Sequence, residues 1–348
     1  MEDMAWGAVA ALVGLVGGAV LGLAGRLGNF CTLGAIETAL YAHDQRRLRM
    51  WALVLGVAIL STQALAAAGL IDLAATQYHA IRWQPMASIL GGAMFGYGMA
   101  LAGNCGFGAL VRFGGGDLRS LVIVGVMGIV GFMALSGPLA PLRVQLFPQE
   151  AALVPHDMAH DLGAALGLAP GLVALALGAG LVLFALAHAP FRVAHGHVGW
   201  GVAAGLAVAW CLAGTSWAAQ ASFGAVGVEG PSYTAPVGRT LLYLMTSTGG
   251  GLSFSVGSVA GVLIGAFTGS MLRGLFRWEA CDDASELGRQ VGGAALMGVG
   301  GTIAMGCSLG QGLTGFATLA WSGPVTLAAI VAGAALGLAQ LLGRFERG

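Results

Sequence analysis

Apolar residues run in long uninterrupted stretches along this chain, and polar residues collect in the short segments between them. The stretches long enough to suggest helices are 5–24, 51–70, 86–102, 118–135, 171–189, 198–213, 252–272, 291–305 and 324–342. A helix crosses a hydrocarbon core of about 30 Å with roughly 20 apolar residues. The alternation of apolar and polar positions that is typical of strands is absent from them. The pattern predicts an all-α, polytopic protein embedded in a lipid bilayer.

The composition agrees with this pattern. Of the 348 residues, 57% are hydrophobic and only 9% are charged, whereas soluble domains carry about 25% charged residues. The net charge of zero gives no indication of nucleic-acid binding. The five cysteines include no C-x-x-C pair, so neither a dithiol redox motif nor a zinc site is predicted. We expect no cofactor.

A glycine-rich signature occurs twice in the chain, 202 positions apart. The two copies are Gly91-x4-Gly96-x-Gly98-x6-Cys105-x2-Gly108 and Gly293-x4-Gly298-x-Gly300-x6-Cys307-x2-Gly310. The same shift relates Thr32 to Thr234 and Tyr41 to Tyr243. We therefore interpret residues 1–137 as a first membrane repeat and 200–348 as a second. Residues 138–199 form a proline-containing connector with one extra transmembrane span.

The placement of arginine predicts how these halves are oriented. Arg46, Arg47 and Arg49 crowd the turn before the apolar stretch at 51, which marks that turn as cytoplasmic. The loop 71–84 holds only Arg82, whereas its repeat equivalent around 273–289 holds three arginines. Equivalent loops on opposite sides indicate an inverted-topology repeat. The N-terminus is then expected in the periplasm and the C-terminus in the cytoplasm.

Four segments are helical in pattern but too short to span a bilayer: 29–41, 105–113, 231–243 and 307–316. At 1.5 Å per residue the longest of them reaches only about 20 Å. Broken or re-entrant helices of this kind are tolerated at membrane depth only where protein or a cavity surrounds them. In transporters, such half-helices direct their N-termini at an anionic ligand.

Three cysteines share one context. Cys31, Cys105 and Cys307 each follow a glycine-rich break and open a short apolar segment. A side chain there lies beside unpaired backbone N–H groups and the positive end of a helix dipole, which favours anions. The alternative is that cysteine simply packs well between membrane helices. Recurrence in one context favours a function for these three, while Cys211 and Cys281 are expected to be dispensable.

Ionisable residues outside the cysteine segments leave several alternatives open. Glu37 and Arg239 are equivalent under the 202-residue shift and each lies in a short apolar segment. They could pair with each other, lie near the membrane interfaces, or bring Arg239 into contact with a ligand. A set in the connector has a helical spacing that could hold a metal ion, although a surface helix explains it better. This set is His156, Asp157, His160 and Asp161.

The residues resemble the YeeE/YedE sulphur-transport family of bacterial inner-membrane proteins. The resemblance is carried by the breaks before Cys105 and Cys307, by Asn29-Phe30-Cys31, and by Pro231-Ser232-Tyr233-Thr234-Ala235-Pro236. It implies an hourglass-like bundle with a thin central barrier and a transporter of thiosulfate, not an enzyme. It also implies that Cys105 and Cys307 are central thiols and that Cys31 lies near an entrance. Some family members act with a small sulfur-carrier protein, which here would be a separate polypeptide.

The chemistry of thiosulfate fits these side chains. The dianion has three hard oxygens, which the amides of Asn104 and Gln311 could receive, and one soft sulfur, to which a neutral thiol can donate weakly. Weak serial binding lets the ion leave again. We expect the thiols to be protonated during transport, because a thiolate would repel the dianion. Two alternatives stay open: a permease or channel for another small sulfur- or selenium-containing anion, and a membrane sulfurtransferase that forms a cysteine persulfide.

Overall fold

The computed structural model describes residues 2–152, 157–248, 251–280 and 284–345, so Cys281 and His156 lie outside the described residues. Its helices, in chain order, are α1 (Glu2–Leu27), α2 (Thr32–Leu40), α3 (Arg46–Ala67), α4 (Gln77–Ala80), α5 (Pro85–Ala102), α6 (Gly106–Gly114), α7 (Leu118–Leu135), α8 (Ala140–Leu146), α9 (Met158–Leu166), α10 (Pro170–Leu186), α11 (Ala189–Arg192), α12 (His195–Ala221), α13 (Ala235–Thr246), α14 (Phe254–Leu272), α15 (Ala284–Ile303), the π-helical turn η1 (Gly310–Gly315) and α16 (Ser322–Phe345).

The long helices confirm the predicted polytopic helical membrane protein. Within the described residues, seven segments are long and apolar enough to cross a membrane: Ala5–Leu40, Arg46–Ala67, Pro85–Gly114, Leu118–Leu135, His195–Ala221, Phe254–Leu272 and Ser322–Gly343. Large apolar side chains on these helices stay exposed, as at Leu12 (62%) and Leu336 (68%). In water such a surface would be unfavourable, and in a bilayer it faces lipid.

Two of the nine predicted apolar stretches do not form a spanning helix by themselves. The stretch at 171–189 is the 17-residue helix α10, which is long enough to span only if α9 is counted with it across a bend of 108°. The stretch at 291–305 is the second part of α15, which begins with polar residues that include Glu286 and Arg289. The length of an apolar run alone did not reveal either property.

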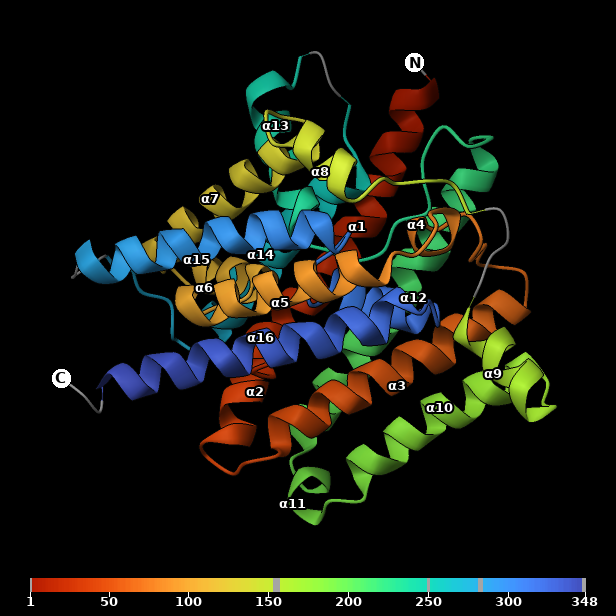
Figure 1. Ribbon diagram of the computed structural model, residues 1–348, viewed down its shortest axis with the longest axis horizontal. Coiled ribbons are helices and arrows are strands. Elements are labelled where there is room, and N and C mark those ends of the chain that lie inside the picture. The colour runs from red at the N-terminus through yellow and green to blue at the C-terminus, as the bar shows by residue number, and fades with distance from the viewer. Residues whose placement is uncertain (1, 153–156, 249–250, 281–283, 346–348) are drawn as a thin grey trace.

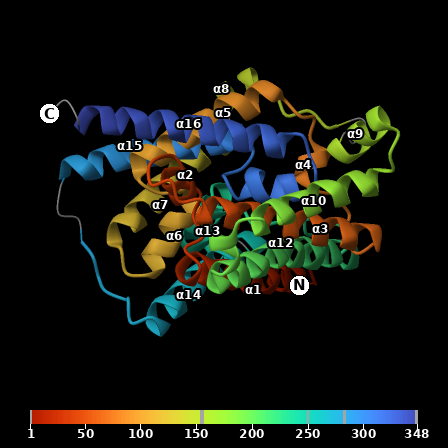
Figure 2. The ribbon, with the colours of Figure 1, turned by 90° about the horizontal axis from the view of Figure 1, so that it is seen from below.

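The long helices form two layers around the short ones. In Figure 2, α5, α15 and α16 run along the upper edge, whereas α1, α12 and α14 run along the lower edge. The short helices α2, α6 and α13 lie between, where α6 packs on α7 and α14 and α13 packs on the same two helices. Helix α10 of the connector packs on the outside of α3 (Figure 1).

Glycine allows two helices of one layer, α1 and α14, to pack closely. Three glycines of α1 and three of α14, each set spaced by four residues, face the backbone of the other helix, and an added Cβ atom would overlap a backbone oxygen there. These glycines are Gly14, Gly18, Gly22, Gly257, Gly261 and Gly265. Small residues at this spacing let transmembrane helices approach through van der Waals contact.

Equivalent helices of the two proposed repeats run antiparallel where they meet. Gly98 lies against the carbonyl of Gly293, and Gly91 lies against that of Gly300, so α5 and α15 run in opposite directions. Helices α1 and α12 do the same, since Gly28 adjoins Trp200 and Val13 adjoins Gly214. The packing is also reciprocal, because α1 packs on α14 and α12 packs on α3. The division into repeats 1–137 and 200–348 stays a prediction, and this antiparallel pairing supports it.

Candidate functional site

Cys31 and Cys105 each cap the N-terminus of a short helix. Cys31 precedes α2 in an extended conformation, and Cys105 does the same before α6. Gly103, in a left-handed conformation (φ 73°), ends α5 and lets the chain turn back toward α6. The Cys105 sulfur accepts a hydrogen bond from the backbone N–H of Gly108 at 3.2 Å. Cys105 is fully buried, whereas Cys31 is partly accessible.

Cys307 occupies the corresponding place before η1. The chain reaches it through Met305, a non-glycine residue in the left-handed conformation (φ 58°) at the position equivalent to Gly103. The Cys307 sulfur accepts backbone N–H hydrogen bonds from Gly310 and Tyr233, both at 3.3 Å. The hydroxyl oxygen of Ser232 lies 3.9 Å from the same sulfur. Sequence reasoning did not single out these contacts of the 231–236 stretch.

The three cysteine segments meet inside the bundle. A Cβ atom added to Gly108 would lie 3.4 Å from the sulfurs of both Cys31 and Cys105, so these sulfurs are no farther apart than twice that distance. The residues that follow Cys31 and Cys307 are also joined, because the Thr32 hydroxyl donates to the Ser308 hydroxyl at 3.0 Å. Both hydroxyls are buried. The structure therefore brings together three segments that are far apart in sequence.

Aromatic side chains pack around the place where the three cysteine segments meet. The ring of Phe30 lies 5.1 Å from Trp51 and 6.1 Å from Phe107, and Phe107 lies 5.4 Å from Tyr233. The buried Tyr233 hydroxyl shares a hydrogen bond of 3.2 Å with Ser258. Because these rings are almost completely buried, the thiols of Cys105 and Cys307 lie in a region with little room for water.

A cavity of about 230 Å³, which we call the arginine cavity, adjoins Cys31. The charged side chains that line it are Arg26, Arg47, Arg112, Arg273 and Glu37. Arg273 donates to the carbonyl of Leu27 at 2.7 Å, which ties the end of α14 to the end of α1. Asn104 also lines this cavity. Four guanidinium groups with one carboxylate make its interior attractive to an anion.

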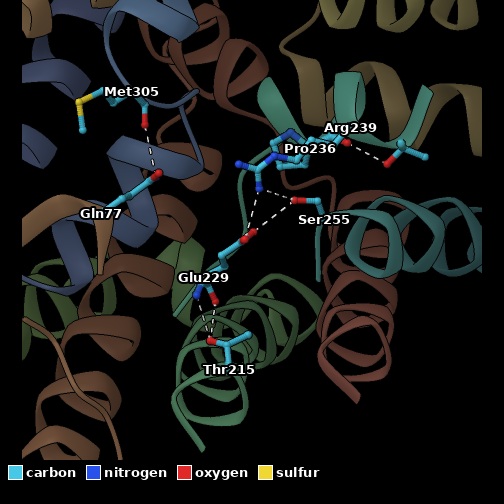
Figure 3. A network of polar contacts seen from close by, with 8 residues as sticks. Gln77, Thr215, Glu229, Pro236, Arg239, Ser255 and Met305 are labelled. Carbon is cyan, nitrogen blue, oxygen red and sulfur yellow. Dashed lines mark hydrogen bonds and ion pairs between the residues drawn. The ribbon is translucent and has the colours of Figure 1, made fainter. Parts of the chain in front are cut away.

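A second cavity, of about 420 Å³, adjoins the Cys307 segment through Ser232 and Gly306. We call it the glutamate cavity after Glu229 in its wall. Figure 3 shows Arg239 and Ser255 both directed at Glu229, with distances of 3.3 Å from Arg239 to Glu229 and 3.2 Å from Ser255 to Glu229. Thr215 holds the backbone of Glu229 from the other side through hydrogen bonds of 2.8 and 3.1 Å.

The alternative of a Glu37–Arg239 pair was wrong. Arg239 pairs with Glu229 in the glutamate cavity, whereas Glu37 lines the arginine cavity. The predicted inverted repeat would account for this outcome, because equivalent positions would then face opposite sides of the membrane. The sequence analysis did not identify Glu229 as a residue of the site. Its position between Gly227 and Gly230, next to an apolar stretch, could have indicated it.

Other residues singled out from the sequence lie elsewhere. Gln311 donates to the carbonyl of Ala304 at 2.8 Å, which fixes η1 on the turn before Cys307, but it lines neither of the two cavities. Cys211 packs in a separate cluster with Ala10 and Phe254. The connector histidine His160 pairs with Asp157 at 2.8 Å. The described part of the chain holds no group of three His, Cys, Asp or Glu residues suited to a metal ion.

Comparison with known proteins identifies relatives along most of the chain. A family model described as sulphur transport matches residues 27–336. A protein of Escherichia coli (strain K12) named thiosulfate transporter TsuA is 26% identical over 335 residues, which cover 92% of this chain and 92% of that protein. A protein of the same name from Spirochaeta thermophila is 25% identical over 323 residues, which cover 89% of this chain and 92% of that protein.

Proposed function

Because the chain belongs to the sulphur-transport family, we propose that it takes up thiosulfate across the bacterial inner membrane. The single observation that carries the proposal is the meeting of Cys31, Cys105 and Cys307 between two cavities. The ion would enter the glutamate cavity, pass the buried thiols, and leave through the arginine cavity. The names of the two relatives support thiosulfate as the substrate.

The arginine cavity is the cytoplasmic end in this proposal. Arg46, Arg47 and Arg49 lie at the start of α3 beside it, and Arg273 lies at the end of α14. An excess of arginine on one side supports a cytoplasmic location for that side. The N-terminus is then periplasmic and the C-terminus cytoplasmic. The sulfur-carrier protein expected from the family resemblance would receive the ion at this end.

The contacts of the thiols suit weak binding of a dianion. Backbone N–H groups donate to the sulfurs of Cys105 and Cys307. These bonds use sulfur lone pairs and so do not occupy the S–H of a protonated thiol, which can donate to the passing ion. The N-terminal ends of α2 and α6 add positive dipole ends. Each contact is weak, which is what permits release.

Uptake of 35S-labelled thiosulfate by bacteria that lack other sulfate and thiosulfate importers tests this function. We expect uptake with the unsubstituted protein and a loss of at least tenfold with Cys105→Ala. Cys211→Ala is the matched control, because Cys211 is an equally buried thiol that lines neither cavity. Full uptake by Cys105→Ala, or no uptake by the unsubstituted protein, contradicts the proposal.

The same cells separate the two alternatives. A sulfurtransferase would hold an added sulfur on Cys105 or Cys307 after exposure to thiosulfate, and mass spectrometry of the intact protein would detect it. A transporter leaves both cysteines unmodified. A permease for another sulfur or selenium anion would show uptake of that anion in preference to thiosulfate in a direct competition.

A further inference from the structure

The hydrogen bond between Thr32 and Ser308 has no counterpart at the equivalent place in the other half. Under the 202-residue shift, this pair corresponds to Thr234 and Gly106. Gly106 has no hydroxyl to offer, although an added Cβ atom there would lie 3.5 Å from the carbonyl oxygen of Tyr233, next to Thr234. Two hydroxyls are therefore hydrogen-bonded to each other on the Thr32 side of the place where the cysteine segments meet, whereas the structure describes no such pair on the Thr234 side.

The unmatched hydroxyl is that of Thr234. Its Oγ1 atom is buried and has no hydrogen-bond partner among the described residues, and the residue as a whole is only 2% exposed. Buried polar groups in folded proteins nearly always have a partner, so an orphan hydroxyl calls for an explanation. A bound ligand is such a partner.

Thr234 also lies where a ligand would pass. It lines the glutamate cavity together with Ser232, and it immediately precedes α13. The hydroxyl of Ser232 is 3.9 Å from the sulfur of Cys307. Ser232 and Thr234 thus line the same cavity as the Glu229 and Arg239 pair shown in Figure 3, and the Cys307 thiol lies next to Ser232, just outside the cavity wall.

We propose that Ser232 and Thr234 form a binding subsite for the –SO3 end of a sulfur oxyanion, with Cys307 facing its terminal sulfur. The inference rests on the proposed function and adds to it the residues that receive the oxygens. The hydroxyls donate to two oxygens, and the ion supplies the partner that Thr234 lacks. On the arginine side the corresponding hydroxyl, Thr32, is already bonded to Ser308, so the subsite exists on one side only. The ion would meet it before the central thiols.

Equilibrium dialysis of purified protein against 35S-thiosulfate, together with uptake into proteoliposomes, tests the subsite. Thr234→Val keeps the shape and removes the hydroxyl, and Thr234→Ser keeps the hydroxyl. The matched control is Thr326→Val, because Thr326 is also buried, its Oγ1 has no partner within the described part of the chain, and it lines neither cavity. Loss of one hydrogen bond to a charged group predicts a roughly 10- to 100-fold weaker affinity and a matching rise in KM for Thr234→Val alone.

Equal affinities for Thr234→Val and the unsubstituted protein would overturn the subsite. Equal losses of affinity in Thr234→Val and Thr326→Val would also overturn it, because they would show that removing any buried hydroxyl group weakens binding. Binding that responds as expected without any uptake would support the subsite while refuting the proposed transport. Absence of binding by the unsubstituted protein would refute both.

Discussion

Replacement of Gly108 by alanine should slow transport without harming the fold. Gly108 is the third residue of α6 and lies next to the sulfurs of both Cys31 and Cys105. Its new methyl group would lie 3.4 Å from each sulfur and 3.8 Å from the Asn104 side chain, which are ordinary van der Waals distances. The methyl group therefore fits the resting structure but occupies space next to both thiols.

The size of each effect can be worked out from these contacts. Alanine is favoured over glycine inside a helix by about 0.8–1.0 kcal/mol, so Gly108→Ala should unfold at the same temperature as the original protein or higher. An ion that passes along these thiols must displace the methyl group, and overpacking of this kind costs about 1–3 kcal/mol. If that cost falls on the rate-limiting step, uptake slows roughly 5- to 150-fold.

The assay compares initial rates of 35S-thiosulfate uptake in proteoliposomes with thermal unfolding of the same preparations. Gly125→Ala is the control, because a Cβ atom at Gly125 would meet no atom within 4 Å. Both variants should retain or gain stability, and only Gly108→Ala should lose uptake. Normal uptake by a stable Gly108→Ala protein would show that the ion does not pass along Cys31 and Cys105.

Two further predictions concern packing and charge. Gly261→Ala should lower the unfolding temperature, whereas Gly125→Ala should not, because the new methyl group at position 261 would meet the backbone of Leu15. Overpacking of this kind costs about 1–3 kcal/mol, which exceeds the gain in helix propensity. Equal unfolding temperatures of the two variants would contradict the close packing of α1 on α14. Glu229→Gln should lower the KM for thiosulfate by up to about fivefold, since an exposed ion pair holds at most about 1 kcal/mol and its loss frees Arg239 to attract the dianion. This effect should shrink in high salt, and an unchanged KM at low salt would show that Arg239 does not bind the ion on its way in.

Much of the architecture was readable from the sequence because two simple patterns determined it. Apolar length predicted the spanning helices, and the spacing of glycine and cysteine predicted short helices that begin next to Cys31 and Cys105. The register of 202 residues related Gly103 to Met305, and both adopt the same left-handed turn. These features follow from local backbone preferences and from burial, and both can be predicted from patterns in the sequence.

The contacts across the centre were not readable in the same way. The bond between Thr32 and Ser308 joins hydroxyls 276 positions apart, and no local pattern marks serine or threonine as a partner. The pairing of Arg239 with Glu229 was missed for a different reason. The predicted repeat symmetry suggested Glu37 as its partner, but Glu37 and Arg239 line different cavities. Which groups meet near such an axis depends on how the halves dock.

The burial of Cys105 and Cys307 has a consequence for the electrical side of transport. If ions from each compartment fill the cavities, most of the membrane voltage falls across the few side chains around Cys105 and Cys307. Moving one charge through 100 mV involves about 2.3 kcal/mol. A dianion that enters a negative interior therefore has to overcome an electrical free energy of roughly twice that amount. Net uptake then requires that the ion be consumed quickly inside the cell or that cations accompany it. Flux measured in vesicles should accordingly rise when the interior is made positive.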